Sequence, residues 1–246
     1  MPLVQHAQRE VTLKVVYYGV GLGGKTTNLE AIHAQTRPEY RGKLVSVNTE
    51  AERTLFLDFL PLELGEFRGY TMRLHLISVP GQIAQDSTRQ MVLRNVDGVV
   101  LVIDSQADAV EGNNYSIRNL DYNLRQHGID PDRIPMVVQY NKRDLSNILD
   151  VEELATRLGV PEAIPQLVAS ARDGWGVLET VKSIVRVCMH QLGDPGLRSD
   201  GRVECLLDEP RGRFYPSGPV SMIHALKPGE QELELDLDEL ELVSGS

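Results

Sequence analysis

A glycine-rich stretch near the N-terminus, residues 19–27, has the spacing of a loop that binds phosphate. It reads Gly-Val-Gly-Leu-Gly-Gly-Lys-Thr-Thr and fills every fixed position of G-x-x-x-x-G-K-[ST]. Glycines let the backbone curl until its N–H groups point at phosphate oxygens, and the helix expected to follow adds its positive N-terminal end. The expected phosphate-binding residues are Gly19, Gly21, Gly23, Gly24, Lys25, Thr26 and Thr27.

Two side chains of this loop have chemistry of their own. We expect Lys25 to reach the β- and γ-phosphates as a point charge and the Thr26 hydroxyl to coordinate Mg²⁺. The alternative is a glycine-rich turn that binds nothing. It would leave a lysine at a helix N-terminus without an anion to face, which is unfavourable.

A second polar stretch, Asn141-Lys142-Arg143-Asp144, indicates which base the site takes. A carboxylate at position 144 accepts from both the ring N–H and the amino group of guanine, and adenine presents no such pair of donors. We expect Asn141 to brace the loop and the Lys142 stem to lie along the base plane. Ser170 and Ala171 follow the next strand, where the Ala171 backbone N–H would donate to the guanine oxygen.

Apolar runs alternate with helical patterns along the chain, which predicts an α/β fold with a mostly parallel sheet and helices on both faces. Such sheets bind ligands at the carboxyl ends of their strands, where both polar stretches fall. Residues 36–52 are expected to form a long mobile loop, and 61–69 to join two strands. Strands are expected at 11–18, 54–60, 70–79, 98–103, 135–140 and 166–169, and helices at 27–36, 87–95, 111–127, 151–158 and 176–192.

Four segments together resemble the MglA family, small Ras-like GTPases of bacteria that set cell polarity for motility. They are residues 17–29 (YYGVGLGGKTTNL), 49–61 (TEAERTLFLDFLP), 79–82 (VPGQ) and 139–145 (QYNKRDL). The resemblance covers roughly residues 8 to 192. It implies the fold of a Ras-like P-loop NTPase, with GTP or GDP and Mg²⁺ bound and GTP hydrolysed slowly.

The resemblance also assigns roles in hydrolysis. Arg53 matches an arginine that the family supplies in cis to stabilise charge in the transition state. Thr54 matches the threonine that senses the γ-phosphate and Mg²⁺. Gln82 matches the glutamine that orients the attacking water, and Gly81 beside it is expected to bind the nucleotide. These roles suit phosphoryl transfer, which depends mainly on positioning and charge stabilisation. From the residues alone, a solvated loop arginine is a fair alternative for Arg53. An ordinary turn residue is a weaker alternative for Gln82, because Gln82 follows Pro-Gly at this site.

Two positions depart from the pattern of Ras-like proteins. Most of them carry aspartate where Ser78 stands, and that aspartate holds a magnesium-bound water; MglA-like proteins lack it. Asp58, on the neighbouring predicted strand, is a candidate for the missing carboxylate, and a surface acid paired with lysine or arginine is an equal alternative. Gly23 stands where better-known relatives carry cysteine, a change that removes no ligand.

The resemblance further implies a partner that activates hydrolysis, an MglB-like dimer of the Roadblock fold that presses Arg53 and Gln82 into place. Effector and exchange proteins would bind the segments that respond to the nucleotide. A different class of function, a nucleotide-dependent binding module without turnover, is disfavoured by intact Lys25, Arg53 and Gln82. An ATP-dependent kinase is disfavoured by Asp144.

The charge of the chain is concentrated at its C-terminal end. The net charge is −10, and the stretch from Asp194 onward contributes −7 of it through 12 acidic and 5 basic residues. We therefore expect a Ras-like domain at 1–193 and an acidic, largely irregular tail at 194–246. Residues 230–243 alternate acids with leucine, which suits either a solvated disordered end or a segment that adds to a partner's sheet.

The rest of the composition limits the partners. A nearly balanced domain argues against nucleic-acid binding, which needs a basic face. The sequence has no signal-peptide core, no C-terminal prenylation cysteine and no run long enough to span a membrane. We expect a cytoplasmic protein without a membrane anchor of its own, which partners would bring to a cell pole.

Overall fold

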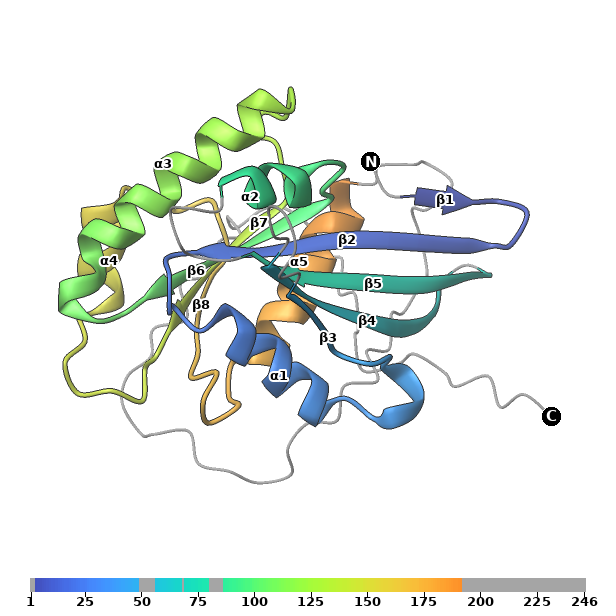
Figure 1. Cartoon of the computed structure of the whole chain (residues 1–246), viewed down its shortest axis with the longest axis horizontal. Helices are drawn as coiled ribbons and strands as arrows, with labels where there is room; N and C mark the ends of the chain where they lie inside the picture. Colours follow the sequence, from blue (N-terminus) through green and yellow to red (C-terminus); the bar gives the residue numbers. More distant parts are fainter. Residues whose placement is uncertain (1–2, 49–55, 68, 80–85, 192–246) are drawn as a thin grey trace, which may run out of the picture.

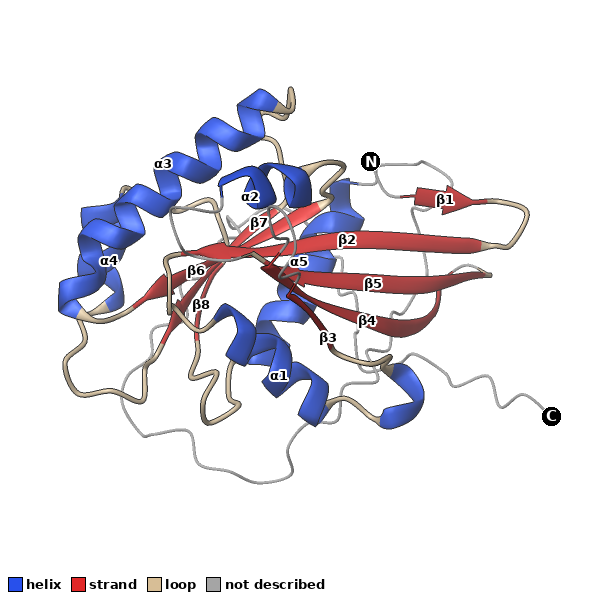
Figure 2. Ribbon diagram, viewed as in Figure 1, coloured by secondary structure: helices blue, strands red, loops and turns tan. Residues whose placement is uncertain are grey.

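The computed structural model describes residues 3–48, 56–67, 69–79 and 86–191. In this part of the chain strands and helices alternate around one sheet, as Figures 1 and 2 show. The strands are β1 (Leu3–Gln5), β2 (Glu10–Gly19), β3 (Val45–Asn48), β4 (Phe56–Phe67), β5 (Tyr70–Ser78), β6 (Gly98–Asp104), β7 (Met136–Asn141) and β8 (Gln166–Val168). The helices are α1 (Lys25–Gln35), α2 (Asp86–Leu93), α3 (Val110–Gln126), α4 (Val151–Leu158) and α5 (Val177–Gln191), with 3₁₀ turns η1 (Pro38–Tyr40) and η3 (Ala107–Ala109).

The sheet has the strand order β3-β4-β5-β2-β6-β7-β8, and β1 pairs with the N-terminal part of β2. The five strands from β5 to β8 in this order run parallel, whereas β3, β4 and β5 form an antiparallel edge. Strand β6 is buried along its whole length, as its continuous apolar sequence predicts for a central parallel strand. The predicted α/β class with a mostly parallel sheet is confirmed.

Helices cover both faces of the sheet and enclose two separate cores (Figure 1). On one face α1 and α5 contribute apolar side chains such as Leu29 and Ile184. On the other face α2, α3 and α4 contribute Leu93, Leu124 and Leu154. Burial of a leucine or isoleucine stabilises a fold by about 1.5–3 kcal/mol, so these two layers fix the sheet whose ends carry the site.

The structure corrects two of the predicted loops. The predicted loop at 36–52 contains η1 and strand β3, which pairs with β4. The predicted connection at 61–69 is mostly strand, because β4 continues to Phe67. Pro61 is tolerated there because the ladder of β3 with β4 ends at Phe59. Beyond it the Gly42 N–H donates to the Pro61 carbonyl oxygen at 2.8 Å, a contact that needs no N–H from Pro61.

A further strand, β1, has no counterpart in the prediction, because it is only three residues long.

None of the described helices is long and apolar enough to cross a membrane.

Candidate nucleotide site

The phosphate loop joins the end of β2 to the start of α1, and two of its glycines are required by their surroundings. Gly24 precedes α1 with a φ of 92°, and a Cβ there would lie 2.3 Å from Asn141 Nδ2. Gly19 has a φ of 148°, and a Cβ there would lie 2.2 Å from the Val102 carbonyl oxygen. Only glycine allows this curl so close to two neighbouring strands.

Lys25 turns back into this loop, where its ammonium is almost completely buried. Its Nζ donates to the carbonyl oxygens of Gly19 at 3.0 Å and Val20 at 2.6 Å. Burial lowers the pKa of Lys25 to about 7; repulsion by the Arg89 guanidinium acts in the same direction and the Asp58 carboxylate opposes it. A buried cation that lacks sufficient negative charge is suited to a phosphate anion, so the loop fits the group that its sequence predicts.

The Thr26 hydroxyl lies beside the carboxylate of Asp58, which is on strand β4. Asp58 Oδ2 accepts hydrogen bonds from Thr26 Oγ1 and from Ser78 Oγ, each at 2.7 Å. Its other oxygen, Oδ1, accepts from Ser46 Oγ at 2.7 Å. Within the described residues Asp58 thus accepts from three hydroxyls, and its carboxylate also acts electrostatically on Lys25. A role for Asp58 beside a metal stays a prediction.

The predicted guanine stretch, residues 141–144, begins at the last residue of β7, and Asn141 joins it to the phosphate loop. Asn141 Nδ2 donates to the Gly23 carbonyl oxygen at 2.9 Å, a contact of the kind that a residue bracing the loop would make. Asn141 Oδ1 accepts from the Ala171 N–H at 2.9 Å. That N–H is therefore engaged within the protein in this structure, and the predicted donation to the guanine oxygen stays a prediction.

Asp144, the carboxylate predicted to select the base, lies at the same edge of the sheet. Ser170 Oγ donates to Asp144 Oδ1 at 2.8 Å, and the Arg172 guanidinium lies 4.0 Å from Asp144 Oδ2. Ser170 and Asp144, which the sequence predicts at two different strand ends, are therefore in direct contact. Thr27 and Gly21 lie half-buried in helix α1 and in the phosphate loop, respectively.

Sequence reasoning missed several residues that support the site. Two of them are Asp104 and Gln106, which accept from the predicted residue Lys142: its Nζ donates to Asp104 Oδ2 at 2.6 Å and to Gln106 Oε1 at 3.0 Å. Beneath the phosphate loop, Asn28 Nδ2 donates to the Gly24 carbonyl oxygen at 2.9 Å, and Gln139 Nε2 donates to Asn28 Oδ1 at 2.9 Å. Polar residues within apolar segments are the signal that could have found Asn28 and Gln139, since buried amides need partners.

Four predicted residues, Arg53, Thr54, Gly81 and Gln82, lie outside the described residues, and so does the tail at 194–246. In the part that is described, no group of three or more His, Cys, Asp or Glu side chains forms a metal cluster. The predicted Mg²⁺ site needs none, because Mg²⁺ is usually held by one or two protein ligands together with substrate phosphates and water.

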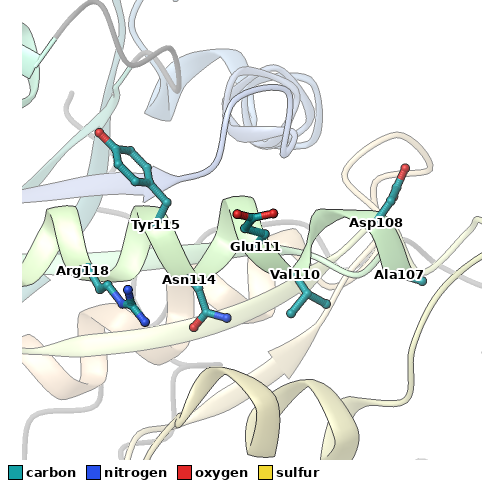
Figure 3. A pocket seen from close by; sticks show the side chains of 7 residues that line it. All are labelled: Ala107, Asp108, Val110, Glu111, Asn114, Tyr115 and Arg118. Carbon is teal, nitrogen blue, oxygen red and sulfur yellow. The ribbon is translucent and has the colours of Figure 1, made fainter.

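A surface hollow of about 590 Å³ lies at the N-terminal half of α3. Figure 3 shows the residues that line it: Ala107, Asp108, Val110, Glu111, Asn114, Tyr115 and Arg118. The same stretch of α3 approaches the phosphate loop, since a Cβ on Gly112 would lie 2.8 Å from Val20 Cγ2. The hollow is therefore near the loop but contains none of the predicted nucleotide-binding residues.

No family model matches the chain. A comparison with curated proteins finds the mutual gliding-motility protein MglA of Myxococcus xanthus (strain DK1622), which is 47% identical over 196 residues. The match spans 80% of this chain and 100% of the relative. Identity of this extent, together with a Ras-like sheet and a phosphate loop and guanine stretch at one edge of it, shows that the chain belongs to the MglA family of small Ras-like GTPases.

Proposed function

We propose that this chain is a molecular switch that binds GTP and GDP with Mg²⁺, hydrolyses GTP slowly and acts in cell polarity or gliding motility. The observation that carries the proposal is the convergence of Lys25, Thr26, Asn141 and Asp144 at the carboxyl ends of parallel strands. The name of the Myxococcus relative, a gliding-motility protein, supports the cellular role.

Binding of the phosphates rests on Lys25 and the loop amides. The lysine's present acceptors are two backbone carbonyls. Phosphate oxygens carry full negative charge and would satisfy the buried ammonium better. The positive end of α1 would act on the same oxygens, because the helix begins at Lys25.

Mg²⁺ would be held by Thr26 and, from outside the described residues, by Thr54. We infer that Asp58 takes the place of the aspartate that Ser78 replaces. It is already 2.7 Å from the Thr26 hydroxyl and 2.7 Å from the Ser78 hydroxyl. A carboxylate there would accept hydrogen bonds from water on the metal, and the metal itself would offset the charge that develops on the phosphates.

Base selection rests on Asp144 and turnover on Arg53 and Gln82. Ser170 Oγ donates to one oxygen of the Asp144 carboxylate at 2.8 Å, which restricts the orientation of that carboxylate. Arg53 and Gln82 would act when a partner presses them into place, as an MglB-like Roadblock dimer would. The proposal places the chain in the cytoplasm, from which partners recruit it to a cell pole.

The experiment that tests this function compares nucleotides and partners. GTP and GDP should displace a fluorescent guanine nucleotide far better than ATP does. Release of inorganic phosphate from GTP should be slow alone and much faster with a Roadblock-fold partner. Equal displacement by ATP would contradict the guanine assignment, whereas hydrolysis that no Roadblock partner accelerates would contradict only the proposed activation.

A further inference from the structure

The lysine of the guanine stretch is held by a carboxylate from a different strand. Lys142 Nζ lies 2.6 Å from Asp104 Oδ2, at the end of β6, and the two side chains are only 24% and 7% exposed. Gln106 Oε1 accepts from the same ammonium at 3.0 Å. The backbone of Lys142 has a φ of 65°, which is disfavoured for residues other than glycine. This position therefore depends on neighbouring contacts to keep its conformation.

Hydrogen bonds hold both the backbone and the carboxylate of Asp104. Its Oδ1 accepts from the Gln106 N–H at 3.1 Å, which leaves Oδ2 facing Lys142. The buried side chain of Asn113, on helix α3, accepts from the Asp104 N–H at 3.1 Å and donates to the Asp104 carbonyl oxygen at 2.9 Å. The carboxylate is thus a rigid acceptor, because both its backbone and its second oxygen are already bonded.

The backbones of the two segments are joined as well. Asp104 pairs with Asn141 in the ladder between β6 and β7, and the Ser105 N–H donates to the Asn141 carbonyl oxygen at 3.2 Å. Further along, the Leu149 N–H donates to the Ser105 carbonyl oxygen at 2.9 Å. The guanine loop therefore rests on the segment that begins with Asp104, and movement of one would require movement of the other.

We propose that Asp104 is a positioning residue for the nucleotide, which holds the Lys142 stem against the base plane and so slows nucleotide release. This inference rests on the proposed guanine-nucleotide binding. Asp104 acts through Lys142, which would contact the face of any purine, whereas Asp144 reads the groups specific to guanine. Loss of the Asp104 carboxylate should accordingly weaken binding of GDP and of IDP, which lacks the 2-amino group, by the same factor.

The test measures the release of a fluorescent GDP analogue from the full-length chain. Asp104→Asn keeps the shape but removes the charge, and it should accelerate release about tenfold, equivalent to about 1.4 kcal/mol. In a Lys142→Met background the same change should add less than about twofold, because the two residues act as one unit. Gln106→Leu, which should leave the fold intact, should give a smaller acceleration, about twofold, and this too should vanish in the Lys142→Met background.

Asp97→Asn provides a matched control. Asp97 immediately precedes the first residue of β6, as Asp104 is its last, and its carboxylate accepts from the Lys14 N–H at 2.8 Å. It should lower the melting temperature without changing GDP release. Release at the native rate in both Asp104→Asn and Gln106→Leu overturns the inference, as does an acceleration of equal size without Lys142. If the native chain does not retain GDP, the proposed function itself is wrong. If the native chain retains GDP and the variants release it at the native rate, only the inference about Asp104 is wrong.

Discussion

Nucleotide binding should be accompanied by uptake of a proton at Lys25. Burial, with repulsion from Arg89, lowers the pKa of this lysine from 10.5 to about 7. A difference of this size disfavours the charged form by an amount on the order of 5 kcal/mol. Phosphate oxygens against the ammonium would favour the charged form again and return the pKa above the working pH. The bound complex therefore holds a proton that much of the free protein lacks.

The expected uptake follows from the pKa of the free protein. Near pH 8 a lysine of pKa about 7 is charged in roughly one molecule in ten, so binding of GDP should take up about 0.9 proton. Near pH 6 the uptake should fall to about 0.1 proton. Affinity for GDP should accordingly decrease by close to tenfold for each pH unit above about 8.

The lowered pKa of Lys25 also determines how the free energy of unfolding depends on pH when no nucleotide is added. Between about pH 7 and pH 10.5 the unfolded chain holds the lysine proton more tightly than the folded chain does. The free energy of unfolding should therefore rise with pH through this window, and the full penalty should be present below about pH 7. Added GDP should offset the penalty most strongly at the acidic end, where the lysine is charged without an anion.

Titration calorimetry with GDP in two buffers of different ionisation enthalpy measures the uptake directly. At pH 8 the nucleotide's own phosphates are fully ionised, since the second pKa of a phosphate group is about 6. Arg89→Met should reduce the uptake by removing the repulsion, whereas Arg94→Met, at an exposed arginine just after α2, should not change it. An uptake near zero at pH 8 in the native chain would refute the reasoning.

Four further results are expected. Asp58→Asn should raise the Mg²⁺ concentration needed to retain GDP about tenfold or more; an unchanged Mg²⁺ titration would exclude a role near the metal. Asp144→Asn should move preference toward xanthine nucleotides, because each buried donor left unpaired costs about 1–3 kcal/mol; the measure is competition between GDP and XDP, and retained guanine preference would contradict it. Arg53→Ala and Gln82→Leu should each reduce partner-stimulated hydrolysis by about 10³ or more with GDP affinity nearly intact, and native turnover in either would remove its assigned role. Removal of residues 194–246 should leave GDP affinity and basal hydrolysis unchanged at low and high salt, and a salt-independent gain would indicate that the tail inhibits.

The long periodic elements of the fold could be predicted from the sequence, and the short or interrupted ones could not. Strand β6 is apolar from Gly98 to Ile103 and helix α4 ends at Gly159, so both have local signals. Strand β4 contains Pro61 and Gly65, which normally mark a turn. Its ladder with β5 shifts register between Glu63 and Glu66, and Gly65 has a φ of 87°, so the glycine marks a bulge inside a continuing strand.

The site divides in the same way, between residues fixed by local spacing and residues fixed by strand register. Lys25 and Asp144 lie in short motifs whose geometry is set within a few residues. Asp58 and Asp104 reach the site only because Asp58 pairs with Ser78 across β4 and β5, and Asp104 with Asn141 across β6 and β7. A slip of one residue would point either carboxylate to the opposite face, and no local pattern sets that register.

The loops predicted to bind phosphate and base are joined to each other by hydrogen bonds from the Asn141 side chain. Its amide donates to Gly23 in the phosphate loop and accepts from Ala171 after β8, so one side chain spans three loops. Gly24 has no side chain where a Cβ would lie 2.3 Å from Asn141 Nδ2. A methyl group at position 24 would push the amide away from both partners. Such a change, although it lies in the phosphate loop, would therefore also disturb the loop predicted to select guanine, because the two loops share a single hydrogen-bonded amide.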